Sequence, residues 1–350
     1  MSRTEATPRA REAPFLIDIA LQGGGSHGAF AWGVLDRLLD FDWIEVEAIS
    51  GTSAGAMNAA VFAHGMQAGG RAGAKRALRD FWRSVARAAA WGPFQRSPVD
   101  RMMGRWTLDN SPLYIATDLM ARLVSPYALG GVGAKFNPLR RILEEAIDFE
   151  ALAKGPIKLF ITATNVRTGR GRVFRSHEIS ADVLLASACL PSMYQAVEID
   201  GEFYWDGGFS GNPTMTPLVR ECEALDTFLV QINPVERPDI PRSARDIVNR
   251  VNEVSFNATL LKELRMIALL RQVADPGNSE GRLWAEMRLH RITSDVLRTL
   301  GASSKLNAEW AFLKMLREEG RRAAMEFEQA HGKDVGVRST FDIDSLLEGV

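Results

Sequence analysis

The sequence predicts a three-layer α/β/α sandwich with a mainly parallel central sheet and a helical C-terminal region. Two early segments carry this prediction, because each is a short apolar run that ends in small residues and continues as a helical pattern. The first run is Ile17–Leu21, and the helical pattern of residues 29–39 follows it. The second run is 43–49, followed by residues 54–64. Strands that alternate with helices form βαβ units, whose parallel sheet is covered by helices on both faces.

Composition indicates a globular chain without a strong bias in charge. The 350 residues are 46% hydrophobic and 24% charged, which suits one large α/β domain with additions. The formal net charge of −1 gives no basis for nucleic-acid binding or for attraction of the whole molecule to anionic membranes. Any membrane contact must therefore be local.

We expect three regions along the chain. Residues 1–14 are polar and contain two prolines, which predicts a disordered tail without the apolar core of a signal peptide. Residues 15–240 form the main domain, and 241–350 a helical region that packs on it or forms an oligomer contact. Within the domain, 91–136 breaks the strand and helix pattern with many aromatic residues and methionines, so it is either a mobile lid over an acyl-chain cleft or a helical insertion.

The sequence contains no run of 18 apolar residues, so it predicts no transmembrane helix. Cys189 and Cys222 are the only cysteines, a number typical of a reducing compartment, and a disulfide between them is not implied. We therefore expect a cytoplasmic protein, with membrane association left open.

The segment Gly51-Thr52-Ser53-Ala54-Gly55 joins the second strand to its helix. Small residues on both sides of Ser53 allow a sharp turn that lifts its hydroxyl clear of the sheet at a helix N-terminus, where a serine nucleophile works. An ordinary N-cap serine is the alternative.

The glycine-rich segment after the first strand predicts an anion-binding loop. Successive glycines let bare N–H groups converge on one oxygen beside the dipole of the following helix, as in an oxyanion hole. The same glycines also satisfy Gly-x-Gly-x-x-Gly for a dinucleotide loop. Against that reading, Glu45 and Glu47 lie inside the next strand, whereas a ribose-binding acid stands at the strand end. The oxyanion-loop candidates are Gly23, Gly24, Gly25, Ser26, His27 and Gly28.

Asp206 lies at the predicted end of a strand that follows an Asp200-Gly201 hairpin turn. Gly207 and Gly208 come next and allow another side chain to approach the carboxylate closely. A plain turn residue is the alternative to a catalytic aspartate.

In this order, the three stretches resemble the patatin-like phospholipase family, over roughly residues 15–215. The resemblance includes the segment Ala186-Ser187-Ala188-Cys189-Leu190-Pro191 before the aspartate strand. It implies a Ser53–Asp206 dyad, with Gly51, Gly55, Gly207 and Gly208 as supporting glycines and no metal or organic cofactor. His27 departs from the family, which more often has arginine or lysine there, so any positive charge at this position would depend on pH.

The resemblance also implies the reaction: release of fatty acids from phospholipids or related acyl esters through an acyl-enzyme. Three alternatives stay open. The base can instead be a histidine in a Ser-Asp-His triad, for which His290 or His331 follows the aspartate. The segment Leu289-His290-Arg291 looks helical and His331 lies near a predicted helix end, so both look structural, which favours the dyad. The substrate can be another ester, a thioester or a polyester. Finally, the protein can be a lipid-binding protein without catalysis. The expected partners are the lipid substrate, a peripheral membrane contact and a second copy of the chain.

Overall fold

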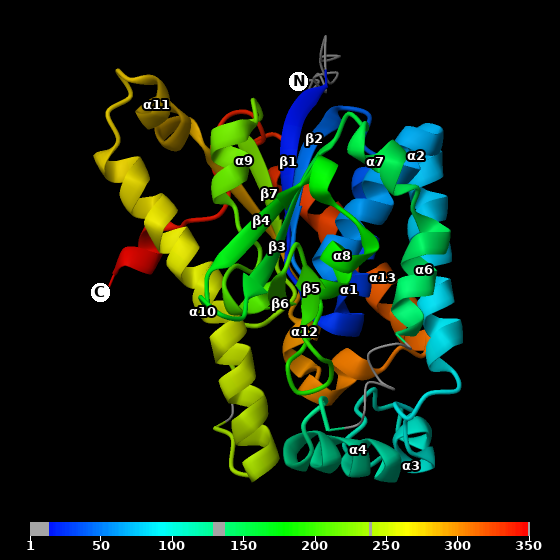
Figure 1. Cartoon of the computed structure of the whole chain (residues 1–350). Coiled ribbons are helices and arrows are strands. Elements are labelled where there is room, and N and C mark those ends of the chain that lie inside the picture. Colours follow the sequence, from blue (N-terminus) through cyan, green and yellow to red (C-terminus); the bar gives the residue numbers. More distant parts are fainter. Residues whose placement is uncertain (1–13, 129–136, 238–239, 349–350) are drawn as a thin grey trace, which may run out of the picture.

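The computed structural model describes residues 14–128, 137–237 and 240–348. A central sheet is covered by helices on both faces, which confirms the predicted three-layer sandwich (Figure 1). The predicted N-terminal tail lies outside the described residues except for Pro14, as does the part of the 91–136 insertion from 129 onward.

The sheet has eight strands in the order β5-β6-β3-β2-β1-β7-β8, with β4 paired to β3. All pairs among β3, β2, β1, β7 and β8 are parallel, and the pairs that involve β4, β5 and β6 with β3 or each other are antiparallel. The strands are β1 (Phe15–Leu21), β2 (Ile44–Gly51), β3 (Lys158–Asn165), β4 (Gly171–Arg175), β5 (Val197–Ile199), β6 (Glu202–Asp206), β7 (Asp226–Val230) and β8 (Arg288–Ile292).

One face of the sheet carries the larger core. Gly33 of one helix and Gly320 of another let the two helix backbones meet, since a Cβ at either position would lie 2.0 Å from a carbonyl oxygen of the partner helix. The helices of this face are α1 (Gly28–Leu38), α2 (Ala54–Ala89), α6 (Pro138–Ala146), α7 (Phe149–Ala153), α8 (Ala181–Ser187) and α13 (Trp310–His331).

The second face is covered by α9 (Thr216–Glu221), α10 (Ala244–Val273) and α11 (Ser279–Glu286). Ser243 caps α10 by accepting the N–H of Asp246, as expected for a serine at a helix start. The remaining helices, α3 (Pro98–Met102), α4 (Pro112–Leu123) and α12 (Val296–Thr299), lie toward one end of the molecule (Figure 1).

The C-terminal region corrects one expectation. The segment around His290 looked helical, but it forms β8, which extends the sheet parallel to β7. Leu289 and Ile292 are buried, and so is His290, because its two ring nitrogens find partners in Asp226 and Thr340. Partnered polar groups make a histidine compatible with a buried strand. Near the C-terminus, Asp344–Leu347 forms a short 3₁₀ turn.

Strand order determines where a ligand can bind. β1 and β7 are neighbours, and the chain continues from β1 to β2 on one side and from β7 to β8 on the other, so the strand order reverses between them. In open α/β sheets, such a switch point opens a crevice beyond the carboxyl ends of the strands. The glycine-rich loop follows β1 and the Ser53 turn follows β2, so both candidate elements lie at this edge.

Asp18 on β1 is a buried carboxyl group that faces away from this edge, toward the second core. The Cys222 thiol and the Ala48 backbone are among its polar neighbours, and they offset only part of the effect of burial. Burial, with Glu47 nearby, raises the pKa of Asp18 to about 8. The folded chain therefore holds a proton here that the unfolded chain releases near pH 4, so stability must fall as pH rises from about 4 to about 8.

We expect Asp18→Asn to remove this pH dependence. The gain in free energy of unfolding over wild type should be roughly 3 kcal/mol larger at pH 8 than at pH 5, because only the aspartate loses its proton in that window. Denaturant unfolding at both pH values measures the difference, with the exposed Asp42→Asn as control. An equal effect of Asp18→Asn at both pH values would contradict the assignment of a protonated Asp18.

Candidate active site

Ser53 lies in a strained turn between β2 and α2. Its backbone has φ 56° and ψ −123°, a conformation that non-glycine residues rarely adopt. Space for the turn comes from flanking glycines, since a Cβ on Gly55 would lie 2.3 Å from the carbonyl oxygen of Leu21. The Ser53 N–H donates to the Ser187 hydroxyl at 2.9 Å, and that hydroxyl donates to the Thr162 carbonyl at 2.7 Å. These contacts hold the serine at the N-terminus of α2.

The glycine-rich loop packs directly on this turn. A Cβ on Gly23 would lie 2.7 Å from the Cβ of Ser53, so only glycine permits the contact. The Gly23 N–H already donates to Asn212 Oδ1 at 2.7 Å, which makes Gly23 a supporting residue rather than a free donor. Within the described residues, the N–H groups of Gly24, Gly25 and Ser26 have no acceptor. These three remain the candidates for binding an oxyanion.

Asp206 ends β6, and its carboxyl group lies beside the Ser53 side chain. It is 1% exposed, and one of its oxygens accepts the Gly208 N–H at 2.7 Å. Burial raises the pKa of Asp206 to about 7, opposed by the Gly208 hydrogen bond and by the nearby Ser53 hydroxyl. Gly207 packs on β3, where a Cβ would lie 2.0 Å from the Thr162 carbonyl oxygen. The structure thus brings Ser53 and Asp206 together and gives the carboxylate the proton affinity of a useful base.

His27 does not carry the charge that its position suggested. It is 1% exposed, contacts Ser304 Oγ through Nε2 at 2.8 Å and meets the Phe312 ring edge-on. Burial, with Lys305 and Arg237 nearby, lowers its pKa well below the usual value, so His27 is neutral. A buried neutral histidine replaces the expected pH-dependent cation.

A positive charge reaches the loop from Lys305 instead, which sequence reasoning missed. Its ammonium donates to Asn233 Oδ1 at 2.7 Å, and the Asn233 amide donates to the Gly23 carbonyl at 2.6 Å. Burial lowers the pKa of Lys305 to about 8, with Glu253 opposing the shift, so it is mostly charged at pH 7. Nothing in the local sequence ties Lys305 to a loop 280 residues earlier; only the fold does. Ser187 and Asn212 were likewise missed as positioning residues.

The two triad histidines lie elsewhere. His290 pairs with Asp226 at 2.9 Å near the start of β7, whereas the site is at the carboxyl ends of the strands. Burial favours protonation of Asp226, but hydrogen bonds from His290 and Arg288 outweigh it and lower its pKa to about 2. His331 ends α13 and contacts Asp334. Neither histidine lies near Ser53 in this arrangement.

A pocket of about 240 Å³ opens on the Asp206 side of the site. It touches the site through Cys189, whose carbonyl accepts the Asp206 N–H at 2.8 Å. Its lining residues are Asn137, Leu139, Arg140, Asp182, Leu185, Ala188, Cys189, Tyr194, Gln195, Ala196, Val197 and Glu198.

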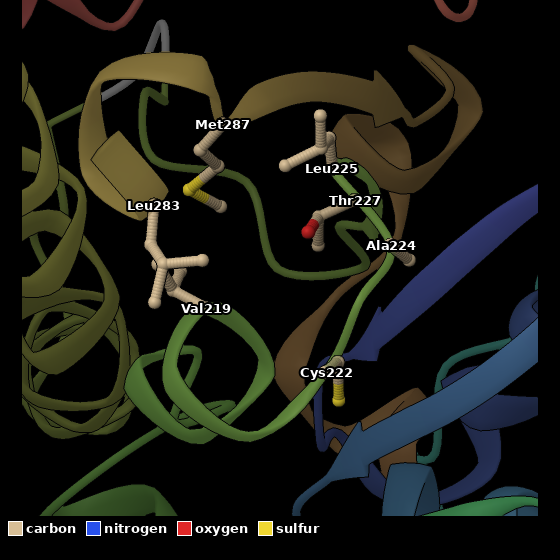
Figure 2. A pocket seen from close by; sticks show the side chains of 7 residues that line it. All are labelled: Val219, Cys222, Ala224, Leu225, Thr227, Leu283 and Met287. Carbon is tan, nitrogen blue, oxygen red and sulfur yellow. The ribbon is translucent and has the colours of Figure 1, made fainter. Parts of the chain in front are cut away.

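A second, much smaller pocket of about 10 Å³ lies between α9, β7 and α11, away from the serine (Figure 2). Beside it, ligand atoms of Asp18, Glu47 and Cys222 lie within 4.8 Å of one another. Both Glu47 oxygens already accept protein donors, including Lys158 Nζ at 2.7 Å, so we assign no metal to this cluster. Cys189 and Cys222 are both free thiols.

The expected insertion forms α3 and α4 within its described part. Leu108 and Tyr114 are buried against the main domain, and many other apolar side chains of the segment are exposed. Whether this segment moves as a lid stays a prediction. No helix among the described residues has the length and apolar character needed to cross a membrane.

The family model described as Patatin-like phospholipase matches residues 19–219, more than half of the chain. No curated protein sequence matches. Among solved structures, VipD from Legionella pneumophila is 16% identical, with 97% of this chain and 79% of that chain covered at a TM-score of 0.35. The heterodimeric ExoU–SpcU complex of the Pseudomonas aeruginosa type III secretion system is 16% identical, with 96% and 66% covered at a TM-score of 0.26. Both TM-scores are low, so the assignment rests on the sequence match: the chain belongs to the patatin-like phospholipase family.

Proposed function

We propose that the protein is a serine acyl hydrolase that releases fatty acids from phospholipids or related acyl esters. One observation carries the proposal: a serine in a strained turn lies between a buried carboxyl group of raised pKa and a glycine loop with unused N–H groups. A serine hydroxyl needs a base, and the charge that develops on the carbonyl oxygen needs donors. This edge of the sheet offers both.

In the acylation step, Ser53 Oγ attacks the ester carbonyl carbon and its proton passes to Asp206. The N–H groups of Gly24, Gly25 and Ser26 stabilise the resulting oxyanion, and each good donor contributes about 3 kcal/mol to such a transition state. Lys305 adds a positive charge behind the loop through Asn233. Collapse breaks the bond to the leaving alkoxide, which takes the proton from Asp206 and departs as an alcohol.

In the deacylation step, a water molecule gives a proton to Asp206 and attacks the acyl-enzyme carbonyl. The bond to Ser53 Oγ breaks, the proton returns to Ser53, and a fatty acid leaves. The pocket of about 240 Å³ beside Cys189 offers room for part of the substrate next to Asp206. No cofactor takes part in either step.

A fluorophosphonate probe and a panel of esters test the proposal. We expect one probe per chain, attached to Ser53 and identified by peptide mass, together with hydrolysis of p-nitrophenyl butyrate, p-nitrophenyl palmitate and phosphatidylglycerol vesicles. Heat-unfolded protein is the control, since labelling must require the fold. Which ester is turned over fastest assigns the substrate class. Labelling elsewhere, or no turnover of any ester, would favour a lipid-binding protein without catalysis.

A further inference from the structure

The segment from Trp91 to Tyr127 exposes an unusual number of large apolar side chains. Trp91 is 96% exposed, Met102 85% and Leu123 72%. Exposed apolar residues scattered singly are ordinary, but a concentrated set marks an interaction surface. We call the set the docking face; it comprises Trp91, Val99, Met102, Met103, Leu113, Ile115, Leu119, Met120, Leu123 and Tyr127.

The charges on the docking face are of one sign over its first half. All residues from 91 to 108 are described, and the exposed charged residues among them are Arg101, which also pairs with Glu309 at 3.6 Å, and Arg105. The acid of this stretch, Asp100, is fully buried against Ser97. Tryptophan, methionine and leucine beside arginine are typical of helices that lie in the headgroup region of a membrane, where arginine meets anionic lipids.

The middle of the segment that carries the docking face is fastened beside the glycine loop. The Leu108 N–H donates to Ser303 Oγ at 3.1 Å, in the 3₁₀ turn that also contains Lys305. The carbonyl oxygen of Lys305 in turn lies 2.4 Å from where a Cβ on Gly25 would be. The segment between α3 and α4 therefore adjoins the oxyanion side of the site.

The end of this segment is fastened beside the catalytic carboxylate. The Tyr127 hydroxyl accepts the Ala196 N–H at 3.1 Å, in a loop held to Cys189 by a thiol contact with the Gln195 carbonyl. Cys189 itself accepts the Asp206 N–H. The segment that carries the docking face thus connects the two sides of the site, and its helices α3 and α4 lie at one end of the molecule (Figure 1).

We propose that the docking face binds an anionic lipid surface and so places the mouth of the site against it. The second half of this statement rests on the proposed function, whereas binding itself does not. A lipid surface fits better than a second copy of the chain, because the exposed Arg101 and Arg105 flank the exposed Met102 and Met103, where anionic headgroups would meet them. The chain has almost no net charge, so this local face supplies the attraction.

Vesicle flotation tests the proposal on the full chain. Vesicles of phosphatidylcholine alone and of phosphatidylcholine with phosphatidylglycerol are the probes. We expect wild type to bind the phosphatidylglycerol vesicles at least tenfold more strongly, and the Met102→Asp, Leu119→Asp variant to lose at least tenfold of that binding. The matched control is Val273→Asp, Val337→Asp, which adds the same charge at sites 68% and 72% exposed outside the docking face.

Three outcomes would overturn the proposal. In the first, the docking-face variant binds vesicles as strongly as wild type. In the second, the control variant loses as much binding as the docking-face variant. In the third, light scattering shows that wild type is a dimer and the docking-face variant a monomer, and neither protein binds vesicles. Hydrolysis of soluble p-nitrophenyl butyrate separates the two proposals, since the docking-face variant should retain it. A wild type that binds vesicles but hydrolyses no ester would refute the proposed function and leave the docking face standing.

Discussion

Replacing Ser53 with alanine is expected to lower kcat/KM for ester hydrolysis by a factor on the order of 10⁴ or more. The reason is that Ser53 is the one hydroxyl-bearing residue with a positive φ in the described part of the chain, and it packs against the glycine loop, so no other described side chain is placed to take over the attack. Residual turnover would come from oxyanion donors acting on water. Initial rates with p-nitrophenyl butyrate, together with the fluorophosphonate labelling, measure the loss.

A second substitution at Ser53 separates the loss of the nucleophile from the relief of backbone strain. Ser53→Gly should be as inactive as Ser53→Ala, but its free energy of unfolding should be about 1 kcal/mol higher than that of Ser53→Ala. Glycine adopts φ 56° without the cost that a side chain adds. Ser210→Ala is the matched control: its hydroxyl bonds to Thr164 near the site without reaching the reacting atoms. Ser53→Ala at wild-type rate would refute the nucleophile.

Local patterns in the sequence were enough to predict the layers and the turn. Ile17–Leu21 and the run before Gly51 have the composition of buried strands, and glycines can be recognised as points of close approach before their neighbours are known. Gly23 shows this, since its lack of a side chain was visible, but the reason for it, contact with Ser53, required the fold.

The parts that sequence missed depend on long-range contacts. Lys305 reaches the glycine loop only because the 3₁₀ turn at Ala302–Leu306 packs beneath Gly25. The sequence does not show whether His27 is charged or neutral, because its buried environment beside Phe312 and Ser304 determines its protonation state. The strand at His290 is hard to predict because Arg288 and Arg291 flank it; their partners, Asp226 and the Phe341 ring, lie far away in the sequence.

Replacing Asp206 with asparagine is expected to lower kcat/KM by about 10³-fold or more, since the amide accepts no proton from Ser53. In wild type, kcat/KM should rise with pH and level off above about 7, because the base must first lose its own proton and burial has raised its pKa to about 7. Asp206→Asn should show no such rise. Rates with p-nitrophenyl butyrate between pH 5 and pH 9, corrected for spontaneous hydrolysis, define both profiles.

Asp206→Asn should also stabilise the fold, although it lowers the rate. A carboxyl group whose pKa is raised by folding contributes stability that is complete below about pH 4 and is lost as pH rises to about 7, at up to about 1.4 kcal/mol per pH unit. Asparagine has no proton to lose, so its gain in free energy of unfolding should grow over that window and stay constant above pH 8.

The control for the dyad is His290→Gln, which keeps a donor for Asp226 and should keep wild-type kcat/KM. If His290→Gln loses activity as Asp206→Asn does while both stay folded, a histidine is the base and the dyad is wrong; if only Asp206→Asn loses it and gains stability, one buried carboxylate accounts for both the rate and the cost in stability.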